Sequence, residues 1–188
     1  MKYILKEIIP VLFIMLLLAG CASLPEHPSG KRVAFETGAI APDFSARDLD
    51  GNEYRLWDLS GKKVILSFWA TYDARSRLQL DDFQEFYTSM DRESVVLLGI
   101  TFKEQEGDMI PLLSRRMISY PNVVDRHGRI GRLYGITIIE NVDSFGHQII
   151  DPDSARSFPV TVLINEDSTI ERIISVQINP KDLYEFTG

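Results

Sequence analysis

Cysteine is nearly absent from this sequence, since Cys21 is the only one among 188 residues. A disulfide within the chain, dithiol exchange and a metal site built from several cysteines each need at least two thiols, so all three are excluded for the chain acting alone. Histidine is also scarce, with only His27, His127 and His147. Acidic residues outnumber basic ones and the net charge is −7, so we expect no nucleic-acid partner.

The first twenty residues have the pattern of a secretory leader. Lys2 and Lys6 precede or flank an apolar stretch whose core, residues 8–18, is short for a membrane-spanning helix of about 20 apolar residues. The sequence LAGC at residues 18–21 resembles the lipobox of bacterial lipoproteins, which implies acylation of Cys21 and stable anchoring in a membrane. The alternative is an ordinary signal peptide, which would leave Cys21 as a free thiol.

The lipobox resemblance also implies a location. A protein lipidated on Cys21 is tethered to a bacterial membrane and faces the periplasm or the cell exterior. Ala22 rather than aspartate follows Cys21, which slightly favours the outer membrane. We expect a signal peptide at residues 1–20, a tether rich in proline and glycine at 21–32, and one domain at 33–188.

Strand and helix patterns alternate along the domain, which indicates a sheet covered by helices on both faces. Apolar runs at 64–69 and 94–101 are typical of central strands. Helical spacing of apolar residues predicts helices over 76–90 and 108–118, the second with Pro111 in its first turn. The other expected elements are strands at 44–46, 53–56, 120–125, 160–165 and 169–176, and short helices at 130–134 and from Pro180 onward.

Six short motifs occur in an order that resembles the thioredoxin-like redoxins, a group that includes the alkyl hydroperoxide reductase/thiol-specific antioxidant (AhpC/TSA) family and the cytochrome-maturation thiol reductases. The resemblance implies a three-layer α/β/α sandwich with a central mixed sheet. It also implies a cis peptide bond before Pro159. The motifs are APDF (41–44), LWDLSGK (56–62), FWAT (68–71), YPNVVD (120–125), LYGI (133–136) and FPVTVLIN (158–165).

The same resemblance identifies a degenerate active site. Relatives continue after FWAT with a CxxC pair at the start of a helix, and here Asp73 and Ser76 stand at the two cysteine positions. Asp73 is well suited to cap the helix, because a carboxylate accepts hydrogen bonds from free amides and is favoured by the helix dipole. The alternative makes Asp73 a metal ligand or an acid–base group. Ser76 would bond to nearby backbone, so we expect no catalytic residue.

The region around this loop could still bind a partner. Arg75 and Arg77 oppose the helix dipole, so they are either solvated or placed to receive an acidic partner or an anion. In the enzymes of this group, the backbone beside the cis-proline pairs with a bound peptide. The predicted partner-binding residues are Trp69, Tyr72, Arg75, Arg77, Phe158 and Pro159.

Residues 137–157 form an insertion before the predicted cis-proline strand. In copper-chaperone relatives an insertion near this point carries a metal-binding histidine, so Asp73 and His147 are the weak metal candidates here. Copper(I) prefers soft sulfur ligands, which the domain lacks, so we expect no cofactor. An insertion this long is more often functional than incidental.

These observations support one main hypothesis and two alternatives. The main hypothesis is a lipid-anchored, redox-inactive binding or assembly factor that recognises a protein or peptide of the cell envelope. The first alternative is the family-type assignment as a thiol-disulfide oxidoreductase or peroxiredoxin-like protein. The second is a metal-handling protein or an enzyme centred on Asp73, Arg75 and His147.

Overall fold

The computed structural model of the protein describes residues 27–102, 104–136, 141–142, 148–149 and 158–188. The chain divides into two compact units, 1–32 and 33–188. The predicted signal peptide at residues 1–20 and Cys21 lie outside the described residues. Within the described ranges no helix is long and apolar enough to cross a membrane.

A five-stranded mixed sheet forms the centre of the second unit, in the order β5-β4-β3-β8-β9. Strand β3 (Lys63–Trp69) is parallel to β4 (Val95–Phe102), which is parallel to β5 (Asn122–Asp125). On its other side β3 pairs antiparallel with β8 (Val160–Ile164), followed by β9 (Ile170–Ile174). The uninterrupted apolar run of β3 is explained by its central place, because helices or loops cover both of its faces.

Successive side chains along β3 enter two separate cores. Leu66 and Phe68 belong to one cluster, whereas Ile65 and Trp69 belong to the other. The second cluster is covered by α2 (Ala74–Ser89), α3 (Glu106–Arg115) and α5 (Pro180–Thr187). We call this side of the sheet the α2 face.

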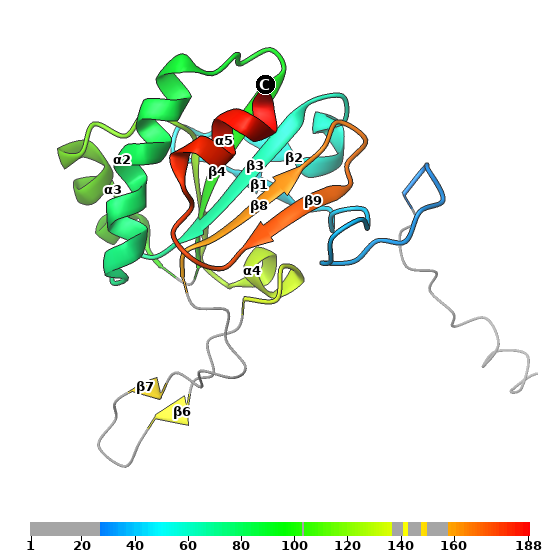
Figure 1. The fold of residues 1–188 in the computed structure, drawn as a ribbon. Helices are drawn as coiled ribbons and strands as arrows, with labels where there is room; N and C mark the ends of the chain where they lie inside the picture. The colour runs from blue at the N-terminus through cyan, green and yellow to red at the C-terminus, as the bar shows by residue number, and fades with distance from the viewer. Residues whose placement is uncertain (1–26, 103, 137–140, 143–147, 150–157) are drawn as a thin grey trace, which may run out of the picture. The chain divides into compact units, whose positions relative to one another are not determined.

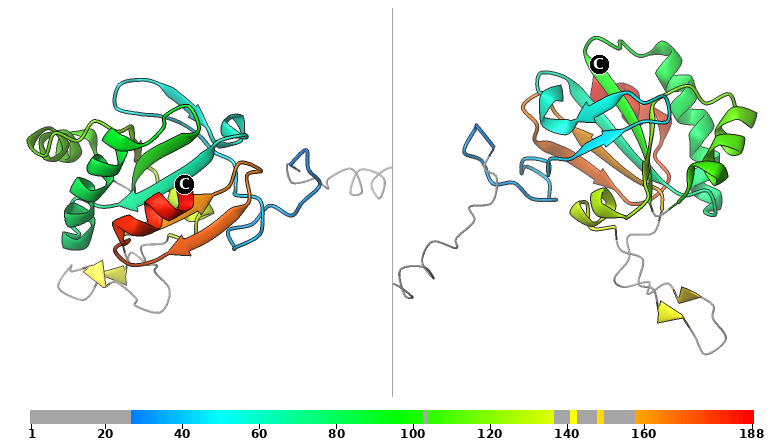
Figure 2. Two further views of the ribbon diagram at one scale, coloured as in Figure 1. Left: turned by 45° about the horizontal axis from the view of Figure 1, so that its top comes forward. Right: turned by 180° about the vertical axis from the view of Figure 1, so that it is seen from behind.

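The opposite side, which we call the α4 face, is covered by α4 (Arg129–Leu133) and by the hairpin of β1 (Ser45–Arg47) and β2 (Glu53–Arg55), which continues into the 3-10 helix η1 (Leu56–Leu59). Figure 1 shows α5 in front of the sheet, and the right-hand view of Figure 2 shows the hairpin crossing the opposite side. The three layers confirm the predicted thioredoxin-like α/β/α sandwich.

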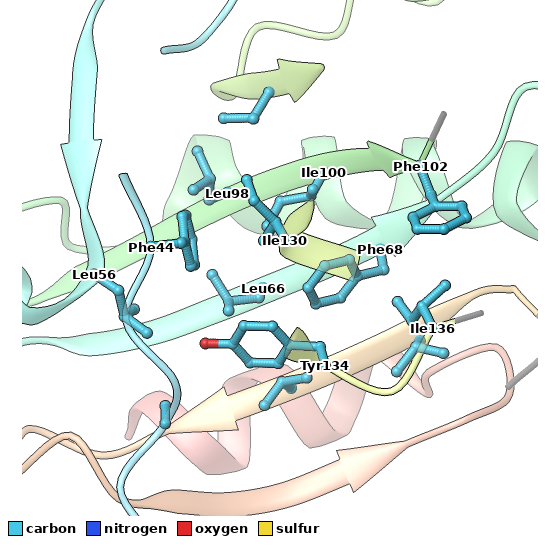
Figure 3. Packing of buried hydrophobic residues seen from close by; sticks show 14 of the residues in the cluster. Phe44, Leu56, Leu66, Phe68, Leu98, Ile100, Phe102, Ile130, Tyr134 and Ile136 are labelled. Atoms are coloured by element: carbon cyan, nitrogen blue, oxygen red, sulfur yellow. The ribbon is translucent and has the colours of Figure 1, made fainter. Parts of the chain in front are cut away.

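Tyr134 organises the core of the α4 face. Its ring lies 5.1 Å from that of Phe68 between centroids, and Figure 3 shows it against the sheet beside Leu66 and Phe68. Its hydroxyl donates to the carbonyl of Pro42 at 2.8 Å. The motif APDF and the motif LYGI therefore meet in space although they are far apart in the sequence.

Two helix predictions need correction. Helix α2 begins at Ala74 rather than at residue 76, because Asp73 caps it. Helix α3 covers Glu106–Arg115 rather than 108–118, so Pro111 lies inside the helix and not in its first turn. The missing N–H of Pro111 leaves the Gly107 carbonyl without its usual helical donor. In the 137–157 insertion only β6 (Asn141–Val142) and β7 (Gln148–Ile149), an antiparallel pair, are among the described residues.

Candidate functional site

Asp73 occupies the N-cap of α2, as predicted. Its backbone is extended, with φ −85° and ψ 124°, and its Oδ1 accepts a hydrogen bond from the Ser76 amide at 2.7 Å. The first free N–H groups of the helix stabilise negative charge at this point, which is the environment that would lower the pKa of a cysteine there. This helix start would stabilise a thiolate, and here it holds the Asp73 carboxylate.

Ser76 is completely buried, and its Oγ has no hydrogen-bond partner among the described residues. The prediction that this hydroxyl bonds to nearby backbone is therefore wrong. The amide of Ser76 is used by Asp73, and the side chain points into the space between α2 and the sheet. A serine nucleophile needs a base within hydrogen-bond reach, and within the described ranges none contacts this Oγ.

Three more buried polar groups lie in the same layer as Ser76. Ser67 and Thr161 are directly opposite each other on β3 and β8, on the face that α2 covers. Gln79 follows Ser76 by one turn of α2, and its Oε1 accepts from the Ile178 amide at 2.9 Å. The Oγ of Ser67, the Oγ1 of Thr161 and the Nε2 of Gln79 have no partner in the described part of the chain. The interior behind the start of α2 thus holds several buried polar atoms that have no partner among the described residues.

Both arginines of the first turn of α2 are tied to the neighbouring backbone. An Arg75 amino group donates to the carbonyl of Phe158 at 2.7 Å and lies 3.8 Å from the Asp73 carboxylate. An Arg77 amino group donates to the carbonyl of Thr71 at 2.7 Å. These contacts correct the alternative in which the two guanidinium groups are simply solvated, and the acidic-partner alternative stays a prediction.

The predicted partner-binding residues differ in what they offer to a partner. Tyr72 is 56% exposed and contacts Phe158 edge-on, with 6.3 Å between ring centroids. Arg75 is half-exposed, whereas Trp69, Phe158 and Pro159 are buried. The Phe158–Pro159 peptide bond is cis, as the resemblance implied. Tyr72 and Arg75 therefore form the accessible part of the site, and the buried residues shape it from below.

Trp69 has a structural anchor that the sequence did not reveal. Its indole N–H donates to Asn122 Oδ1 at 3.0 Å, and the Asn122 amide nitrogen donates to the Tyr120 carbonyl at 2.8 Å. Gly99 makes room for this amide, because a Cβ at position 99 would overlap Asn122 Oδ1. The bond connects the end of β3 to β5 across β4, so it fixes the strand end from which the Tyr72 loop begins.

Glu104 is the site residue that sequence reasoning missed. It is 7% exposed, and its Oε1 accepts from the Thr71 amide at 2.7 Å and from the Thr71 hydroxyl at 2.5 Å. Its Oε2 is buried with no partner within the described ranges. Burial raises the pKa of this carboxyl above its usual value. An acidic residue just beyond a buried apolar strand was the available signal, since its site lies at the carboxyl end of the parallel strands.

The electrostatics around Tyr72 follow from its neighbours. Partial burial, together with the negative charges of Glu104 and Asp73, raises the pKa of Tyr72 to about 12. The phenol is therefore neutral at physiological pH and can donate or accept a hydrogen bond. The accessible surface combines this phenol with the Arg75 guanidinium.

The metal alternative is not tested by this arrangement. His147 and Cys21 lie outside the described residues. In the part of the chain that the structure describes, no group of three or more histidine, cysteine, aspartate or glutamate side chains could hold a metal ion. The structure thus gives Asp73 a capping role, and its role as a metal ligand stays a prediction.

Comparisons with known proteins agree with the fold. The chain is 25% identical over 173 residues to the thiol-disulfide oxidoreductase ResA of Geobacillus thermodenitrificans, covering 92% of this chain and 88% of that protein. The solution structure of a putative protein disulfide isomerase from Bacteroides thetaiotaomicron superposes with a TM-score of 0.64 at 19% identity, covering 81% and 90% of the two chains.

A secreted Mycobacterium tuberculosis disulfide oxidoreductase, described as homologous to Escherichia coli DsbE, superposes with a TM-score of 0.58 at 18% identity and covers 77% and 93% of the two chains. At these identities the structural matches show the fold alone. The model of the AhpC/TSA family matches residues 37–173, most of the domain. By this match and its sandwich architecture, the chain belongs to the AhpC/TSA family of thioredoxin-like redoxins.

Proposed function

We propose that this protein is a redox-inactive binding factor of the bacterial cell envelope, anchored by lipid on Cys21, that recognises a protein or peptide at the surface around Tyr72 and Arg75. The Asp73 cap supports this most strongly. Its carboxylate accepts a hydrogen bond from the Ser76 amide at 2.7 Å, in the place where a dithiol enzyme of this fold needs a thiolate. The accessible surface beside it keeps an aromatic ring and a cation, both typical of binding surfaces.

The comparisons favour the alternative assignment as a thiol-disulfide oxidoreductase, because that is the name of the similar protein ResA. That reaction breaks one disulfide and forms another, so the enzyme alternates between two thiols and a disulfide. The present chain has one cysteine, and it lies in the proposed tether. The proposal therefore keeps the inherited binding surface and drops the exchange step. We expect no reduction of insulin disulfides by the purified protein in the presence of dithiothreitol beyond the rate of the reagent itself.

Arg75 sets a condition on any partner. Its guanidinium already donates a hydrogen bond to the carbonyl of Phe158, next to Pro159. A peptide that pairs with this carbonyl must therefore displace the guanidinium. Once displaced, the guanidinium is available for a bidentate bond to a carboxylate. The proposal therefore favours partner segments that carry aspartate or glutamate near the point of contact.

Cross-linking in intact membranes followed by capture tests this proposal. The native protein is compared with the Tyr72→Ala/Arg75→Glu double variant, and we expect a captured partner to be lost from the variant. Tyr184→Ala is the matched control, because Tyr184 is 45% exposed against 56% for Tyr72 and lies on α5. Helix α5 ends near the start of β3, because Lys63 there donates to the Phe186 carbonyl at 2.6 Å. Trp69 lies at the opposite end of β3.

A partner that is captured equally by the native protein and the double variant would sink the binding surface proposed here. Equal losses from the double variant and from Tyr184→Ala would show a general effect on the fold instead. For the anchor, incorporation of labelled palmitate should be seen in the native chain and be absent from Cys21→Ala. Label retained by that variant would place the lipid elsewhere.

A further inference from the structure

A cavity of about 810 Å³ opens on the α4 face, between the β1–β2 hairpin and the turn that leads from β5 into α4. Tyr54 of the hairpin and Ile130 of α4 line it, together with Ala46 and Val123. Its volume is within the range of about 300–1,000 Å³ that is usual for small-molecule sites. None of these residues belongs to the surface around Tyr72.

Basic side chains reach this cavity from both sides. Arg47 and Arg55 come from the hairpin, and Arg126, His127 and Arg129 come from the turn and from α4. This concentration is unusual in a chain whose net charge is −7. The segment 126–132, with sequence RHGRIGR, contains three arginines and a histidine in seven residues.

Most acidic groups at the cavity are already engaged. Glu53 pairs with Arg47, and Asp58 lies 3.9 Å from Arg55. The buried Asp125 accepts from the amides of Arg129 at 2.8 Å and of Gly131 at 2.7 Å, so its charge is used to hold the turn. Arg55 also binds Asp43 at 2.9 Å, and Arg126 binds Glu106 at 3.2 Å.

The side chains of Arg129 and His127 are different, because neither makes an ion pair or hydrogen bond within the described ranges. Both line the cavity. The pairs of Arg47 and Arg126 are largely exposed, so they contribute little and can exchange a carboxylate for another anion at small cost.

We propose that this cavity is a binding site for a small phosphate-bearing molecule. Arg129 and His127 donate to the phosphate oxygens, with Arg126 or Arg47 turning from its surface partner to complete the contact. Guanidinium groups match the geometry of phosphate and bind it in a bidentate manner. The apolar surface of Ala46, Tyr54 and Ile130 receives the organic part of the molecule.

Titration calorimetry of the chain with inorganic pyrophosphate tests this site, in a Cys21→Ser background so that no lipid of its own is present. Flotation on vesicles of phosphatidylglycerol, against phosphatidylcholine, is the second arm. We expect saturable binding of pyrophosphate that Arg129→Glu weakens by about tenfold or more. Arg132→Glu is the matched control, because it makes the same charge change three residues along, outside the cavity lining. It should change the affinity by less than about threefold, a factor worth under 1 kcal/mol.

We expect binding to pyrophosphate rather than to the vesicles, because the net negative charge of the chain opposes contact with an anionic membrane surface. Binding to phosphatidylglycerol vesicles alone, lost in Arg129→Glu and kept in Arg132→Glu, would retain the phosphate site and assign it to a lipid headgroup. Two outcomes would overturn the proposal: no saturable binding in either arm, or equal losses in the two glutamate variants. Neither bears on the surface around Tyr72, which the membrane capture tests separately.

Discussion

The two faces of the central sheet differ in how completely their buried polar groups are hydrogen-bonded. On the α4 face the Tyr134 hydroxyl and the Asp125 carboxylate find partners on the backbone. On the α2 face, polar atoms stay buried without one within the described ranges. They belong to Ser67, Ser76, Gln79, Tyr120 and Thr161, and Glu104 adds another at the end of β4.

An unpartnered buried polar group costs about 1–3 kcal/mol, so the α2 face carries a penalty that the α4 face avoids. The Asp73 cap lies on this less satisfied side, at the start of α2. The difference teaches that the two faces contribute to the fold in different ways: the α4 face pairs its buried polar groups, and the α2 face holds several that packing alone does not require.

The largest effect should come from placing two thiols at the start of α2. In a Cys21→Ser background, the Asp73→Cys/Ser76→Cys variant should form an internal disulfide and reduce insulin in the presence of dithiothreitol, a gain from no activity. The Ser76 amide, which now bonds to Asp73, would stabilise the first thiolate. Asp73→Cys alone is the control and should stay inactive because it has one thiol. A double variant without disulfide or activity would show that the first turn of α2 no longer has dithiol geometry.

Removing a satisfied group from the α4 face should be costly. Asp125→Ala deletes the carboxylate that accepts from the Arg129 and Gly131 amides, so the free energy of unfolding should fall by about 3 kcal/mol. Urea denaturation followed by circular dichroism measures the change. Asp58→Ala is the control, since that carboxylate is largely exposed and 3.9 Å from Arg55. A loss for Asp125→Ala no larger than for the control would contradict this account.

One substitution made on each face gives the sharpest comparison. Tyr134 and Tyr120 are both buried, but only the Tyr134 hydroxyl has a hydrogen-bond partner among the described residues. Tyr134→Phe should therefore cost about 1 kcal/mol, whereas Tyr120→Phe should be neutral or stabilising. Thermal and urea unfolding of the two variants and the native chain measure these changes in the free energy of unfolding. A larger loss for Tyr120→Phe would remove the contrast between the two faces.

The smallest effect concerns the pH dependence of stability. Burial raises the folded-state pKa of Glu104 above its unfolded value. Between those two values the folded state binds more protons, so this residue makes stability fall as the pH rises through that window. Glu104→Gln should lose this decline and gain stability relative to the native chain on the alkaline side. Unfolding free energies of both proteins from pH 4 to pH 8 give the difference, and parallel curves would show that Glu104 does not titrate in this way.

The sequence was sufficient to predict those parts of the site that depend only on residues adjacent in the chain. The Asp73 cap and the strand before it could be predicted because an N-cap follows from the residue type and a few amides. The wrong start predicted for α3 has a local origin too. Proline is favoured in a first turn, so Pro111 predicts a start at residue 108, whereas the helix begins at Glu106. The cis bond before Pro159 came from family resemblance rather than from the residues themselves.

Long-range contacts explain what was missed. Glu104 meets Thr71 across 33 positions, and Asn122 meets Trp69 across 53, so neither contact leaves a periodic pattern. The polar cavity beside Arg129 likewise needs the hairpin and α4 to come together. A charge count can find the RHGRIGR segment, but only the fold shows that it faces a hollow.

Gly99 has a consequence for how this chain can change over generations. Any side chain there would displace the Asn122 amide and release Trp69, the residue from which the loop to Tyr72 starts. The side-chain bond of Asp73, by contrast, stays within the first turn of α2. A substitution at residue 73 is therefore expected to alter that turn, whereas a single change at a residue with no side chain would disturb the strand end on which the Tyr72 loop depends.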